Sequence, residues 1–180
     1  KKNLKISNKL LKTFSVSVLL VYSSFISAAD DTFPVTTSTS GPVGLIATPT
    51  ARMSNDGEFG FGISKEDPWN RLYAKMQFFP WLESVVRYTE GTYKPYQIGL
   101  PQTWKDKGID IKIRLLEESD KFPALSLGIH DIGGTGAFST EYIVATKRRN
   151  NFDFTLGLGW GYLNGPNHID NPLEFFSDFF

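Results

Sequence analysis

Hydrophobic and polar side chains alternate most strictly near the C-terminal end of the chain, across residues 152–162. Large apolar residues occupy every second position there, and Asp, Thr and Gly occupy the positions between them. A period of two is the pattern of a β-strand with one apolar face and one polar face. The pattern lasts about eleven residues, the length that a tilted strand needs to cross a bilayer. Residues 125–129 carry the same period, and Tyr142 and Val144 continue it in a strand between the two. The weak pattern of residues 140–147 does not decide which face of that strand is the apolar one.

Four earlier segments share this period, so the pattern predicts about seven strands. The earlier strands cover residues 58–64, 71–78, 82–90 and 108–116. Short turn-forming stretches separate most of them, and we expect strands that are neighbours in sequence to pair as hairpins. Residues 93–107 are polar and contain two prolines, which predicts a long loop. The predicted fold class is all-β, an antiparallel meander with no helix after residue 29.

The start of the chain has a different character. Residues 1–29 contain five lysines, then an apolar run, then Ser27, Ala28 and Ala29 before a cleavage position, which is the pattern of a secretory signal peptide. An amphipathic or buried N-terminal helix is the alternative. The apolar run is shorter than the roughly 20 residues of a transmembrane helix. We therefore expect export across a bacterial inner membrane.

Residues 30–43 are rich in Thr and Ser, which predicts a flexible mature N-terminus. Residues 44–180 then form the predicted β-domain. Within residues 41–53, Pro42 and Pro49 exclude a central strand. We expect this stretch to be extended and to pack against the sheet or inside the mouth of a barrel.

A membrane barrel and a soluble sandwich share the alternating pattern, and three features favour the barrel. The signal peptide supplies a route to the outer membrane. One face of the strands carries charges of both signs, as a wet lumen does, and aromatic residues lie near strand ends. The candidate lumen-facing residues are Lys75, Gln77, Glu83, Arg87, Asp110, Lys112, Arg114 and Asp153. We expect the N-terminal part of an outer-membrane β-barrel, a fragment of a longer protein. The alternative is a soluble periplasmic β-sandwich that binds glycan.

Charge and cysteine content remove several classes of function. The chain has 19 basic and 19 acidic residues, and without residues 1–29 it has 14 basic against 19 acidic, a net charge of −5. Nucleic-acid binding needs clustered cations, so we expect no nucleic-acid partner. There is no Cys, so the 180 residues contain no disulfide, zinc–thiolate site or catalytic thiol.

The polar motifs predict structure rather than chemistry, so we expect no catalytic, metal or cofactor site. Residues 131–136 (DIGGTG) precede a strand rather than a helix, which predicts a turn with positive φ instead of a phosphate loop. His130 and His168 lie on different elements and share no ligand spacing. We expect Glu117, Glu118 and Asp120 on a solvated loop, and residues 147–149 (KRR) at a solvated turn.

An enzyme acting on polysaccharide is the third possibility. Such an enzyme needs two carboxylates at a fixed separation across a cleft. Its candidates are the strand acids Glu83, Asp110 and Asp153.

Four segments together resemble the YjbH/GfcD family: residues 44–64, 108–118, 122–148 and 152–163. The most specific block runs from DIGGTG to GLGWGYL, and the resemblance extends over residues 41–176. It implies a large outer-membrane β-barrel connected with exopolysaccharide or capsule production in Gram-negative bacteria. The implied partners are outer-membrane lipid, polysaccharide and other products of the same operon. Some members are lipoproteins, whereas these residues include no Cys to carry a lipid.

Overall fold

The structure is a computed structural model that describes residues 35–99, 101–163 and 171. The predicted signal peptide and His168 lie outside the described residues. No helix in the described part of the chain is long and apolar enough to cross a membrane.

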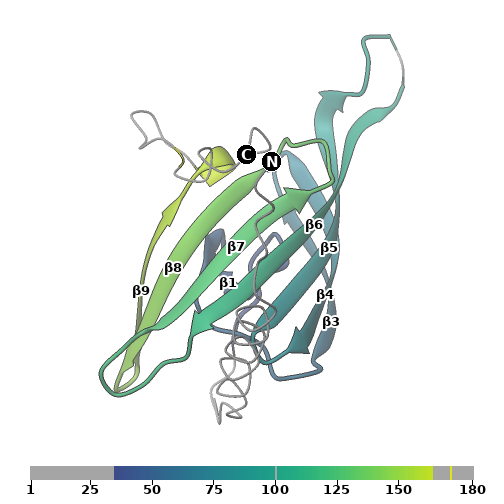
Figure 1. Ribbon diagram of the computed structural model, residues 1–180. Coiled ribbons are helices and arrows are strands. Elements are labelled where there is room, and N and C mark those ends of the chain that lie inside the picture. The colour runs from purple at the N-terminus through teal and green to yellow at the C-terminus, as the bar shows by residue number, and fades with distance from the viewer. Residues whose placement is uncertain (1–34, 100, 164–170, 172–180) are drawn as a thin grey trace, which may run out of the picture. The chain divides into compact units, whose positions relative to one another are not determined.

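Seven long strands form one antiparallel sheet in which each strand pairs with its neighbours in sequence (Figure 1). They are β3 (Phe59–Glu66), β4 (Trp69–Phe79), β5 (Leu82–Pro95), β6 (Thr103–Leu116), β7 (Ala124–Ile132), β8 (Thr140–Arg149) and β9 (Phe152–Gly159). The predicted all-β antiparallel meander is confirmed. Two short strands, β1 (Gly44–Leu45) and β2 (Thr48–Pro49), pair with each other, and a single 3-10 turn, η1 (Gly161–Leu163), follows β9.

The seven-stranded sheet curls into a half-barrel around residues 35–54, which we call the interior segment (Figure 1). Hydrogen bonds prove the curvature. Ser54 contacts Lys75 of β4, and Arg52 contacts Asp153 of β9. Five strand spacings separate β4 from β9, which is about 24 Å in a flat sheet. Residues 52 and 54 are too close in sequence to bridge that distance unless the sheet bends.

The two faces of the sheet have opposite polarity. The inner face, which contacts the interior segment, buries polar side chains, whereas the outer face exposes apolar ones. Buried polar residues of the inner face are Arg71, Lys75, Gln77, Glu83, Arg87, Thr89, Asp106, Asp110, Lys112, Ser126 and Thr146. A water-soluble sandwich places its apolar face inward, so this arrangement is inverted relative to a soluble β-domain.

Apolar side chains of the outer face form continuous rows across neighbouring strands. One row joins cross-strand partners from β5 to β9: Leu82, Ile113, Leu127, Ile143 and Leu158. The exposed fractions reach 81% for both Ile63 and Leu156. A continuous apolar surface of this kind marks contact with another apolar medium or partner.

Two details of the predicted strands were wrong. Residues 93–107 are not a long loop, because β5 extends to Pro95 and β6 begins at Thr103, with Gly91 paired to Trp104. The two strands stay paired from Leu82 to Gly91 of β5, and their register shifts only between Gly91 and Pro95. The last strand stops at Gly159 rather than at residue 162, because Gly161 adopts a positive φ of 71° and turns the chain.

Tyr142 and Val144 lie on the inner face, which the weak pattern of residues 140–147 had left undecided. Both are buried, and Ile143 between them takes the outer position. Tyr142 pairs directly with Gly128, and a Cβ on Gly128 would lie 2.1 Å from the tyrosine ring. The missing side chain at Gly128 therefore provides the space in which the ring lies.

The turn at residues 131–136 has the predicted character. Asp131, Gly133 and Gly136 have φ values of 65°, 70° and 76°, and the turn joins β7 to β8. The carboxylate of Asp131 accepts a hydrogen bond from the backbone N–H of Phe138 at 3.1 Å, which closes the connection.

Candidate functional site

The interior segment is held on the inner face by a buried ion pair between Lys112 and Glu83. The Lys112 ammonium lies 3.1 Å from the Glu83 carboxylate, and it donates hydrogen bonds to the carbonyl oxygens of Val43 at 3.0 Å and Arg52 at 2.9 Å. Glu83 accepts the backbone N–H of Val43 at 3.0 Å. Neighbouring strands thus bind the interior segment through its backbone, in the place where a soluble protein has an apolar core.

Hydroxyl and amide side chains hold the same segment on either side of this ion pair. The backbone N–H of Ala51 donates to Thr146 at 2.9 Å, and Ser126 donates to the Ala51 carbonyl at 3.3 Å. The backbone N–H of Ser54 donates to Gln77 at 3.1 Å. Backbone groups of a non-helical segment need such partners when they are buried. The inner-face polar residues therefore provide hydrogen-bond partners for backbone groups of the interior segment.

The described part of the predicted flexible N-terminus also has defined contacts. Thr37 and Val43 form an isolated antiparallel bridge, and Val43 is 1% exposed. The predicted boundary after residue 43 therefore falls within the interior segment. The expected packing of residues 41–53 against the sheet is confirmed.

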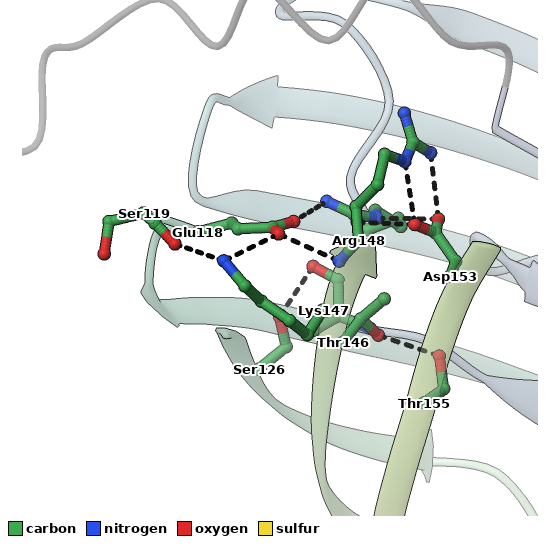
Figure 2. Close-up of polar contacts among 10 residues, drawn as sticks. Glu118, Ser119, Ser126, Thr146, Lys147, Arg148, Asp153 and Thr155 are labelled. Atoms are coloured by element: carbon green, nitrogen blue, oxygen red, sulfur yellow. Dashed lines mark hydrogen bonds and ion pairs between the residues drawn. The ribbon is translucent and has the colours of Figure 1, made fainter. Parts of the chain in front are cut away.

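Charged residues gather at the end of the sheet where β8 joins β9 (Figure 2). We define the ion-pair cluster as Arg52, Glu118, Lys147, Arg148 and Asp153. Arg52 lies 2.7 Å from Glu118 and 2.8 Å from Asp153. Lys147 lies 3.1 Å from Glu118, and Arg148 lies 2.8 Å from Asp153. The cluster joins the interior segment to β8, β9 and the connection between β6 and β7.

Glu118 and Lys147 were predicted to be solvated, but both side chains are largely buried. Glu118 is only 18% exposed and accepts the backbone N–H of Arg148 at 2.9 Å. Lys147 lies within β8 and donates to the carbonyl of Ser119. Both side chains are buried because the connection between β6 and β7 packs against the end of β8.

The charges of the ion-pair cluster support one another. Burial opposes the ionised form of Glu118, but the N–H of Arg148 and the cations of Arg52 and Lys147 outweigh burial and lower the pKa of Glu118. Burial likewise opposes the charge on Arg52, and Asp153 and Glu118 together raise the pKa of Arg52. The cluster is therefore most stable with every member ionised.

We expect the Glu118→Gln variant to lower the free energy of unfolding by about 1–2 kcal/mol at pH 7, since charge-assisted hydrogen bonds are lost. Because the pKa of Glu118 is lower in the folded state, its contribution is complete above the ordinary value of 4.5 and is lost as the pH falls. Urea titrations at pH 7 and pH 3.5 measure this effect. The variant and the parent should differ less at pH 3.5, and an equal difference at both pH values contradicts the ionic role of Glu118.

The predicted lumen-facing residues fall largely on the inner face. Lys75, Gln77, Glu83, Arg87, Asp110 and Lys112 are all buried there. Arg114 is half-buried on the same side of β6, paired with Ser126, and Asp153 lies in the ion-pair cluster with 32% of its side chain exposed. The structure brings Glu83 to Lys112 and Arg87 to Asp110, the latter pair at 2.6 Å.

The sequence analysis did not assign several residues to the interior that the structure places there. Arg52 and Ser54 belong to an aperiodic segment, so no pattern assigned their side chains to the interior. Ser126 had a usable signal, because it alternates with Leu125 and Leu127 and therefore falls on the polar face.

The carboxylates proposed as catalytic residues of an enzyme all form ion pairs. Glu83 pairs with Lys112, Asp110 with Arg87, and Asp153 with both Arg52 and Arg148. In residues 35–99, 101–163 and 171, no group of three or more metal-ligating side chains is placed to hold a metal ion.

The fold and its interior define a class of protein: an antiparallel half-barrel with a polar inner face and an apolar outer face. The chain belongs to the YjbH family, because residues 36–180 match the family model described as "Exopolysaccharide biosynthesis protein YbjH". It is 47% identical over 142 residues to "Uncharacterized lipoprotein YjbH" of Escherichia coli (strain K12), a match that covers 77% of this chain. The matched region spans 20% of that relative. No solved structure matches the chain.

Proposed function

We propose that the protein is an outer-membrane β-barrel with a non-catalytic role in exopolysaccharide biosynthesis and secretion. The inverted polarity of the sheet carries this proposal. Its outer face exposes rows of apolar side chains that suit lipid, and its inner face buries charges that suit a polar lumen. Strands of 8 to 14 residues include those long enough for a tilted crossing of the bilayer.

Membership of the YjbH family supports the connection with exopolysaccharide. The relative from Escherichia coli is named a lipoprotein, which supports a place in the cell envelope. Outer-membrane lipid and polysaccharide are then the partners of the barrel, together with products of the same operon. The interior segment occupies part of the lumen, so its hydrogen bonds to the inner face set the free cross-section.

Fractionation of a host that expresses the complete gene tests the proposal. We expect the protein in the outer-membrane fraction after a sucrose gradient. On a denaturing gel, the unheated sample should migrate faster than the heated sample, because a closed barrel resists detergent. Loss of exopolysaccharide from a deletion strain, restored by the complete gene, tests the functional part.

Recovery from the soluble periplasm with no shift on heating contradicts the barrel and favours the glycan-binding β-domain. Cleavage of polysaccharide by the purified protein, abolished by substitution of Glu83, Asp110 or Asp153, contradicts the non-catalytic role.

A further inference from the structure

A cavity of about 160 Å³ lies on the inner face near the connection between β7 and β8, away from the ion-pair cluster. One water needs only roughly 10–15 Å³, so the cavity admits a larger ligand. Strands β3, β4, β5, β7 and β8 contribute to its wall, β3 through Glu66, as do the interior segment and the turn after β9. The lining residues that matter here are Arg71, Arg87, His130, Phe138, Thr140 and Tyr162.

Arg87 lines this cavity and has buried donors without a partner. Its side chain is buried, and one nitrogen, Nη1, contacts Asp110 at 2.6 Å. Its Nε and Nη2 atoms are buried without a hydrogen-bond partner. A buried donor without a partner is unfavourable, so two such donors on one guanidinium point to an acceptor supplied by a ligand.

Two guanidinium groups flank one aromatic ring. The Phe138 ring centroid lies 5.5 Å from the Arg87 guanidinium carbon and 5.8 Å from that of Arg71. Tyr162 packs edge-on against the same ring at 5.2 Å, and Trp69 supports it at 5.2 Å. Each guanidinium already has one carboxylate partner: Arg71 lies 2.9 Å from Glu66, which also lines the cavity, and Arg87 pairs with Asp110. The cavity therefore combines the remaining donors of two guanidinium groups with an aromatic wall.

His130 and Thr140 add polar atoms between these groups. The Nε2 atom of His130 is buried without a partner, and its ring contacts Tyr142 at a centroid distance of 5.2 Å. Thr140 is paired with His130 across the ladder, and its hydroxyl donates to the Phe138 carbonyl at 3.2 Å, which leaves its lone pairs free to accept.

We infer that this cavity binds one acidic sugar unit of a polysaccharide, through its carboxylate at Arg87 and Arg71 and its ring against Phe138 and Tyr162. A guanidinium matches a carboxylate with paired donors, which makes it selective for a planar anion. Aromatic rings accept the apolar face of a sugar ring, and His130 and Thr140 are placed for its hydroxyl groups. The inference rests on the proposed function, and it adds the class of sugar that the lumen recognises.

Saturation-transfer NMR with the complete protein in detergent tests the inference, with glucuronate and glucose as probes. The two sugars differ only at the carboxylate. We expect glucuronate to bind about tenfold more tightly, which is the effect of a paired charge-assisted contact. Inorganic phosphate should compete only weakly, since it cannot use the aromatic wall.

Four variants identify the site. Arg71→Gln should remove the preference for glucuronate and leave glucose binding unchanged, whereas Tyr162→Ala should weaken both sugars by about threefold to tenfold. Arg87→Lys keeps a cation for Asp110 and should lower glucuronate affinity, because Lys lacks the forked donors. Arg149→Gln, an exposed arginine at the opposite end of β8, is the matched control and should change nothing.

Equal affinity for glucuronate and glucose overturns the inference, as does phosphate competition as strong as that of glucuronate. Glucuronate binding that survives both Arg71→Gln and Tyr162→Ala also overturns it. The two proposals fail separately. A heat-modifiable outer-membrane protein without sugar binding refutes only the site, whereas a soluble protein that binds glucuronate refutes only the barrel.

Discussion

The Lys112→Met variant is expected to lower the free energy of unfolding by about 3–5 kcal/mol, the largest effect of any single substitution considered. The side chain of Lys112 is 1% exposed, and its ammonium is the partner of the Glu83 carboxylate at 3.1 Å. Its removal leaves a buried carboxylate unpaired. It also leaves the carbonyls of Val43 and Arg52 without their donor, so the interior segment loses its central attachment.

Urea titration of the purified protein in detergent, followed by tryptophan fluorescence, measures this change. Lys105→Met is the matched control, because Lys105 lies on the same strand with an exposed side chain. The control should stay within about 0.5 kcal/mol of the parent. The double variant Lys112→Met with Glu83→Leu should recover part of the loss, since no unpaired charge remains. A small effect of Lys112→Met would mean that the interior segment does not depend on the ion pair.

The Leu156→Arg variant is expected to destabilise the folded protein in the membrane by about 2–4 kcal/mol, provided that the outer face meets lipid. Leu156 is 81% exposed near the middle of β9, and its removal leaves no cavity. In a water-soluble domain, a substitution at so exposed a position changes stability by only about 0.5 kcal/mol. The two environments therefore predict different results from the same variant.

The amount of heat-modifiable protein in the outer-membrane fraction measures this effect. Gln102→Arg, an exposed substitution in the connection between β5 and β6, introduces the same charge outside the apolar rows and is the matched control. We expect Leu156→Arg to reduce the folded band and Gln102→Arg to leave it unchanged. Equal yields of both variants would indicate that water, not lipid, covers the outer face.

Much of the sheet could be predicted because a strand assigns each residue to a face by parity alone. Lys75, Gln77 and Lys112 alternate with apolar neighbours, and all three lie on the inner face. Parity did not decide the face of Tyr142 and Val144, which are apolar or aromatic and yet lie on the inner face. Tyr142 fits there because its direct partner is Gly128, whose lack of a side chain can be linked to that ring only when the register is known.

The candidate sites could largely not be predicted from the sequence. Arg52 and Asp153 are 101 residues apart, and only the curl of the sheet brings them to 2.8 Å. The cavity beside Arg87 likewise joins Phe138 from the connection between β7 and β8 with Tyr162 from the turn after β9. No local pattern contains such contacts, because each depends on the shape of the whole sheet.

The sequence by itself determined the all-β class, the order of the strands and the face of most side chains, since these depend on a period of two and on short connections. Only the tertiary structure decided what lies inside the half-barrel. The interior segment has no period, so its position follows from hydrogen bonds to side chains on six different strands. Burial of those polar groups stabilises the fold only when every partner is in place, and that condition is set by the assembled sheet rather than by any stretch of the chain.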